Sequence, residues 1–180
     1  MNIFLNILVP FLCLIIGYLF GSIQIAVIVG KVKFHVDIRE LGSGNAGATN
    51  AGRLWGTKWR IIVTVLDVTK TILPIIMCWA ILSFVPFGGK PLIPMANQIY
   101  TDEAKEFIIQ WPCYYLAGIG VVIGHCWPLF AEFKGGKGAA SFLGAAAVTS
   151  WMFGLLALAG YEIWRKCTKI VSLSMLINSL

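Results

Sequence analysis

The first 30 residues of the chain contain no charged side chain, and this run most limits what the chain can fold into. A helix needs about 20 apolar residues to cross a membrane, so residues 3–30 are predicted to form a spanning helix. A secretory signal would need a basic start and a short apolar core, and this run has neither. Gly17 and Gly21 have the G-x-x-x-G spacing that lets helices pack closely. Lys31 and Lys33 follow directly, which predicts that this end is cytosolic and that the N-terminus lies outside.

The composition extends this prediction to the whole chain. Hydrophobic residues make up 58% of the 180 residues and charged residues only 12%. This balance indicates an all-α, polytopic integral membrane protein. We expect one membrane domain, which would be a helical bundle with short or re-entrant helices and cytosolic motif loops. The formal net charge of +6 comes from basic residues clustered between apolar runs, which is typical of cytosolic loops or of sites for anionic substrates. The five cysteines lack metal-ligand spacing and are interpreted as free thiols, so no metal is expected.

Apolar runs and polar stretches alternate along the chain and predict its segments. The expected order is a span over 3–30, a motif loop over 31–60, a span over 61–86, an outer loop over 87–106, a span over 107–124 and a motif loop over 125–138. Residues 32–38 alternate in polarity, which indicates a short extended or interfacial segment. Residues 139–165 fit either one spanning helix or a helical hairpin, and the positive-inside tendency favours the hairpin. Residues 166–180 would begin a further, truncated helix, because the remaining apolar residues are too few to span.

The first motif loop is rich in small hydrogen-bonding residues. From residue 42 to residue 50 it reads Gly-Ser-Gly-Asn-Ala-Gly-Ala-Thr-Asn, and Arg53 follows. Such side chains and glycine-exposed N–H groups suit a phosphate or carboxylate, and an arginine can add a bidentate contact. The alternative is a surface loop that only caps helices. The loop also matches the G-x-G-x-x-G dinucleotide pattern, but no alternating strand–helix pattern follows, so we reject that interpretation.

The second motif loop contains Phe-Lys-Gly-Gly-Lys-Gly-Ala-Ala-Ser over residues 133–141. Its N–H groups can converge on one point, Lys137 adds an ammonium group, and the start of a helix, which attracts anions, comes next. This pattern predicts a phosphate-binding loop, with a flexible basic turn as the alternative. It does not match the Walker A pattern, because Ala131 and Gly138 stand where that pattern needs a glycine and a serine or threonine.

Three ionisable residues occur near these loops at the ends of apolar segments. Asp67 and Lys70 share one helix face and form either a structural ion pair or a border of the cytosolic site. His125 ends the third span and either binds a ligand or proton or is an interfacial histidine.

Together these stretches resemble the acyl-phosphate-dependent glycerol-3-phosphate acyltransferases of the PlsY type. The first loop is similar to the family's first motif, residues 67–74 to its second and residues 124–138 to its third, and residues 171–174 resemble the segment after the basic turn. The resemblance implies a bacterial plasma-membrane enzyme of phospholipid biosynthesis with a cytosolic site. It would transfer an acyl group from acyl phosphate to the sn-1 hydroxyl of glycerol 3-phosphate, giving lysophosphatidic acid and phosphate without a cofactor.

The resemblance also implies site residues. Ser43, Arg53, His125 and Lys137 are the expected catalytic residues, and His125 or a substrate phosphate oxygen would accept the hydroxyl proton. The expected substrate-binding residues are Gly42, Gly44, Asn45, Gly47, Thr49, Asn50, Asp67, Lys70, Lys134, Gly135, Gly136, Gly138 and Ser172. The expected partners are the two substrates and membrane lipid, with no nucleic acid.

Two other functions remain as alternatives. Family members continue through further membrane helices to a basic segment with His and Asn, so this chain could be an inactive membrane fragment of such an enzyme. An anion transporter would share the basic residues and glycine breaks, although the sequence offers no inverted-repeat partner.

Overall fold

The structure, a computed structural model, describes residues 3–84, 86–87, 90–91 and 113–149, with a few separate residues between 152 and 163. The longer helices in this part are α1 (Ile3–Gly21), α4 (Thr57–Phe84), α6 (Cys113–Cys126) and α7 (Ala139–Thr149). The shorter ones are α2 (Ile25–Val29) and α3 (Ala48–Trp55). The paired strands β1 (Pro86–Phe87) and β2 (Lys90–Pro91) have two residues each. Apart from this small pair, the described chain is helical, as predicted.

Two apolar helical runs in the described residues are long enough to cross a membrane. They are Leu8–Phe34, with a mean hydropathy of 2.4, and Thr57–Leu82, with a mean hydropathy of 2.0. At about 1.5 Å per residue, the continuous helix over Thr57–Leu82 exceeds the ~30 Å hydrocarbon core of a bilayer. Large apolar side chains stay exposed on the outside of the bundle, including Phe11, Ile76 and Ile119. Many large exposed apolar side chains of this kind suit lipid better than water.

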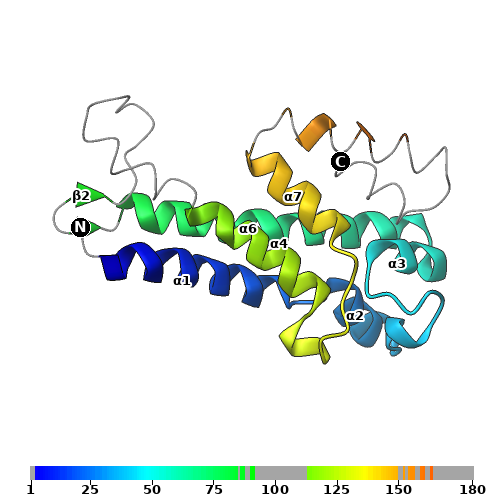
Figure 1. Cartoon of the computed structure of the whole chain (residues 1–180). Coiled ribbons are helices and arrows are strands. Elements are labelled where there is room, and N and C mark those ends of the chain that lie inside the picture. Colours follow the sequence, from blue (N-terminus) through cyan, green and yellow to red (C-terminus); the bar gives the residue numbers. More distant parts are fainter. Residues whose placement is uncertain are drawn as a thin grey trace.

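Helices α1, α4 and α6 run side by side, and α7 packs against α4 and α6 (Figure 1). The contact between α1 and α6 is made backbone to backbone. A side chain at Gly17 or Gly21 would strike the backbone of Ala117 or Val121, and one at Gly120 would strike α1 in return. The close helix packing predicted from the G-x-x-x-G spacing is therefore confirmed.

Helices α2 and α3, which flank the first motif loop, lie at one end of the bundle (Figure 1). Phe34 stacks on Trp55 with ring centroids 4.3 Å apart, and its edge contacts Trp59 at 5.2 Å. These contacts hold α3 beside the start of α4 and against the chain that leaves α2.

Several predicted segment bounds differ from the structure. The first span is interrupted after α1, where the buried Gln24 side chain donates to the carbonyls of Gly21 and His125. The extended segment predicted over 32–38 is wrong. A π-helical turn (Gly30–Phe34) and a 3-10 turn (Ile38–Glu40) occur instead, and the Asp37 carboxylate caps the second turn. The predicted loop over 31–60 contains α3, and α4 already begins at Thr57.

Other predicted segments fall partly or wholly outside the described residues. This is true of most of the outer loop 87–106 and of residues 166–180. Helix α7 begins the segment predicted over 139–165 and fits both a hairpin and a single span, because the choice depends on residues beyond it.

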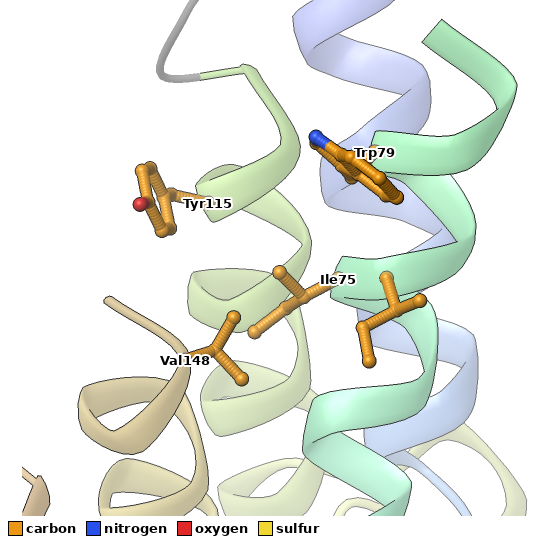
Figure 2. A pocket seen from close by; sticks show the side chains of 5 residues that line it. Ile75, Trp79, Tyr115 and Val148 are labelled. Atoms are coloured by element: carbon orange, nitrogen blue, oxygen red, sulfur yellow. The ribbon is translucent and has the colours of Figure 1, made fainter. Parts of the chain in front are cut away.

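A small apolar hollow lies between α4, α6 and α7. It measures about 210 Å³ and is lined by Ile75, Ile76, Trp79, Tyr115 and Val148. Figure 2 shows these side chains converging from the three helices. The lining carries no charged group, so this hollow is unsuited to phosphate.

Candidate active site

The first motif loop is closed by the side chain of Asn50, which is 1% exposed. Its Oδ1 accepts the N–H of Ser43 at 3.0 Å, and its Nδ2 donates to the carbonyls of Ile38 at 3.1 Å and Leu41 at 2.9 Å. Gly42 has a φ of +60°, and the Asn50 amide oxygen occupies the place where a side chain would be. Only glycine fits there. Asn50 was expected to bind substrate. Its buried side chain instead fixes the backbone of the loop through these three hydrogen bonds.

The other predicted residues of this loop are more open. Ser43, Gly44 and Arg53 are exposed, while Asn45 and Thr49 are half-buried. Arg53 stands in the last turn of α3, whose first turn directly follows the loop. Exposed hydroxyl and guanidinium groups thus lie within one short stretch of chain, and both suit an anion.

The second motif loop and the residues just before it are hydrogen-bonded to the ends of α1 and α6. Leu129 donates its N–H to Ser22 Oγ at 3.1 Å, and Tyr18 donates its hydroxyl to the Trp127 carbonyl at 3.0 Å. The Gly136 N–H donates to the His125 carbonyl at 2.9 Å. The loop then enters α7 through Gly138, so the positive end of an 11-residue helix meets the glycines. Lys134 and Lys137 are both exposed on this loop.

Arg39 joins the two motif loops. Its Nη1 donates to the Ala131 carbonyl at 2.8 Å, across 92 residues of sequence. Its Nε and Nη2 bind the two carboxylate oxygens of Asp37 at 3.0 and 2.7 Å. The hydrogen bonds from Arg39 lower the pKa of Asp37 from its usual 3.8 to about 2, and the carboxylate in turn raises the pKa of Arg39. Both groups are therefore charged at neutral pH.

Neither Asp37 nor Arg39 was among the residues predicted from the sequence. The available signal was an acidic and a basic residue two positions apart, immediately before the glycine-rich loop. Such a pair looks like ordinary solvated charge until the partner at Ala131 is known.

Asp67, Lys70 and His125 meet beneath the loops in the interior of the bundle. The Lys70 ammonium lies 2.9 Å from Asp67 Oδ1 and 3.0 Å from His125 Nδ1. It also donates to the carbonyls of Gly21 at 3.2 Å and Ile23 at 2.7 Å, where α1 ends. The three side chains are 2–6% exposed. The predicted ion pair is present, and the two carbonyls and the imidazole replace the water that the Lys70 ammonium lost.

The remaining predicted residue, Ser172, lies outside the described residues. Within the part of the chain that is described, no group of three or more His, Cys, Asp or Glu residues is placed to hold a metal ion. What the structure gathers is an exposed basic surface from two distant loops, with a buried polar cluster below it.

The chain matches the sequence model of the family described as glycerol-3-phosphate acyltransferase over residues 11–180. It is 36% identical over 163 residues to a glycerol-3-phosphate acyltransferase of Anaeromyxobacter dehalogenans, which covers 91% of this chain and 70% of that relative. It is 37% identical over 174 residues to one from Mycoplasmopsis agalactiae, covering 96% of this chain and 66% of that relative.

Solved structures of PlsY (YgiH), titled an integral membrane glycerol 3-phosphate acyltransferase, have the same fold. The glycerol 3-phosphate form superposes with a TM-score of 0.71 at 31% identity, covering 94% of this chain and 72% of PlsY. The lysophosphatidic acid form gives a TM-score of 0.68 at 28% identity, covering 94% and 71%. These matches bear out the predicted polytopic membrane bundle and a location in a bacterial membrane. The chain belongs to the glycerol-3-phosphate acyltransferase family of integral membrane acyltransferases.

Proposed function

We propose that the chain transfers an acyl group from acyl phosphate to the sn-1 hydroxyl of glycerol 3-phosphate in phospholipid biosynthesis. The observation that carries this proposal is the junction at Arg39, which holds the two glycine-rich motif loops together at one end of the bundle. Relatives that carry the acyltransferase name, and PlsY forms titled with glycerol 3-phosphate and lysophosphatidic acid, support the same substrate class.

The reaction has a simple balance. The sn-1 hydroxyl oxygen attacks the acyl carbonyl carbon, the bond from that carbon to the phosphate oxygen breaks, and phosphate leaves with the electron pair. The hydroxyl proton passes to a phosphate oxygen. Acyl phosphate is already activated, so the protein must mainly bring two anions together and stabilise the developing oxyanion.

The exposed cations of both loops would supply that stabilisation. We assign phosphate binding to Lys134, Lys137 and the glycines Gly135, Gly136 and Gly138, at the positive end of α7. Ser43 and Arg53 would contact the reacting groups from the first loop. The remaining substrate contacts would come from Gly42, Gly44, Asn45, Gly47 and Thr49, with Ser172 from outside the described part.

The same proposal includes an orientation. Lys31, Lys33, Lys58, Lys134 and Lys137 are all exposed on the segments that carry or adjoin the motif loops. The positive-inside tendency puts these segments in the cytosol of a bacterial plasma membrane, with the N-terminus outside. In a cysteine-free background, Ser43→Cys should react with a membrane-impermeant maleimide only after cells are permeabilised. Labelling of intact cells would reverse the orientation.

Turnover by the purified chain tests the activity directly. In detergent or liposomes containing acyl phosphate and glycerol 3-phosphate, we expect phosphate and lysophosphatidic acid to form in equal amounts. Lys137→Ala should lose most of this activity, whereas Lys58→Ala removes an exposed charge from the first turn of α4 and should leave it nearly unchanged. Absence of turnover would support the inactive fragment, and phosphate uptake into liposomes without acyl transfer would support the transporter.

A further inference from the structure

His125 is held from both sides of its imidazole ring. On one side, Nδ1 lies 3.0 Å from the Lys70 ammonium. On the other side, the ring edge with Nε2 lies against the α-carbon of Gly136, where a side-chain carbon would strike Nε2, Cδ2 and Cε1. The Gly136 N–H also bonds to the His125 carbonyl at 2.9 Å. The residue thus connects the buried ion pair to the glycine loop.

The network assigns the tautomer of this histidine. The Lys70 ammonium has only protons to offer, and its other neighbours, Asp67 Oδ1 and two backbone carbonyls, are all acceptors. A proton on Nδ1 would face the ammonium at 3.0 Å, whereas the Nδ1 lone pair faces it favourably, so we assign the proton of the neutral ring to Nε2. Neither nitrogen then offers a free lone pair. At 4% side-chain exposure, the ring could accept a substrate proton only by giving up its contact with Lys70.

We propose that His125 is a positioning residue. Lys70 and Asp67 hold its ring in place, and the ring fixes the position of the Gly136 backbone in the anion-binding loop. This inference rests on the proposed function, because it assigns how that loop is placed for phosphate. It replaces the proton-accepting role considered for His125 from the sequence.

A pair of adjacent glycines provides a matched test. Gly136→Ala places a methyl group against the His125 ring, whereas Gly135→Ala places one against the carbonyls of His125 and Cys126 and the ring of Pro128. His125→Asn keeps an acceptor near the Nδ1 position for Lys70 but removes the ring edge below Gly136. The effect of His125→Asn should therefore be coupled to the effect of Gly136→Ala and not to that of Gly135→Ala.

We expect Gly136→Ala to raise the KM for glycerol 3-phosphate about tenfold or more, because a displaced loop binds poorly. In the His125→Asn background the same substitution should change KM by no more than about threefold. Gly135→Ala should be equally harmful in both backgrounds. Equal effects of Gly136→Ala in both backgrounds would overturn the positioning role.

The pH profile separates positioning from proton transfer. If His125 positions the loop, His125→Asn keeps the shape of the pH profile of kcat and mainly raises KM. A base role predicts a kcat about 10²–10⁴-fold lower and loss of the acidic limb, which would also overturn the proposal.

Binding by itself distinguishes a failure of this inference from a failure of the proposed function. Glycerol 3-phosphate should raise the thermal unfolding midpoint of the unmodified chain in detergent. If it does so without turnover, the midpoint shift replaces KM in the comparison of the glycine variants. No shift and no turnover would overturn the proposed function itself.

Discussion

Arg39→Met is the most direct test of how the two motif loops are joined. Methionine keeps an unbranched apolar stem, but it removes the donor to the Ala131 carbonyl and both donors to Asp37. We expect the variant to fold without the hydrogen bond that joins the two motif loops. Its stability and its substrate binding should both fall.

The size of the effect follows from the burial of the pair. The side chains of Arg39 and Asp37 are 16% and 13% exposed, between a buried and a surface pair. Breaking a buried pair costs about 3–5 kcal/mol and a surface pair under about 1 kcal/mol, so about 2 kcal/mol is expected here. If the full amount appears in kcat/KM for glycerol 3-phosphate, activity falls about 30-fold.

Lys31→Met is the matched control. Lys31 also contacts Asp37, but at 3.7 Å and with a side chain that is 61% exposed. Its loss should change kcat/KM and the thermal midpoint very little. Asp37→Asn should have an intermediate effect, because Arg39 can still reach Ala131. The reasoning is refuted if Arg39→Met behaves like Lys31→Met in folded, monodisperse protein.

Three further outcomes are expected. Asn50→Ala removes three hydrogen bonds from the first loop and should lower the unfolding free energy by about 1–3 kcal/mol; an unchanged denaturation midpoint in detergent would contradict this. Gly120→Leu should prevent α1 and α6 from packing and abolish folded protein in the membrane fraction, while Ile119→Leu, at an exposed neighbouring position, should be tolerated. Because the pKa of Asp37 is lowered to about 2, its stabilising contribution is complete above the unfolded value of 3.8 and is lost as the pH falls from there toward 2. The thermal midpoint should therefore drop more steeply over that acidic range in the unmodified chain than in Asp37→Asn.

Much of the fold could be predicted because its signals are local. The uncharged first run, the glycine spacing at Gly17 and Gly21, and the two glycine-rich loops each follow from neighbouring residues. Membrane burial and helix packing act directly on such patterns.

The parts that could not be predicted depend on partners distant in sequence. Arg39 looks like surface charge until its hydrogen bond to the carbonyl of Ala131, 92 residues later, is known. Asn50 fits a ligand-binding pattern, but its three bonds go to the backbone of its own loop. For the same reason the break after Gly21 was missed, since Gln24 bonds to the carbonyl of His125, 101 residues away.

The buried Lys70 cluster also has a consequence for biosynthesis. Helix α4 carries Asp67 and Lys70 into the bilayer, and the carbonyls that receive the ammonium belong to the end of α1. The imidazole that completes the shell arrives only with α6, 55 residues after Lys70. The ammonium has three protons, and Asp67 with the carbonyls of Gly21 and Ile23 can accept all of them before α6 is present. We therefore expect α1 and α4 to hold this charge as a pair during insertion, which limits the cost of an ionised group in lipid, and α6 to add the imidazole afterwards.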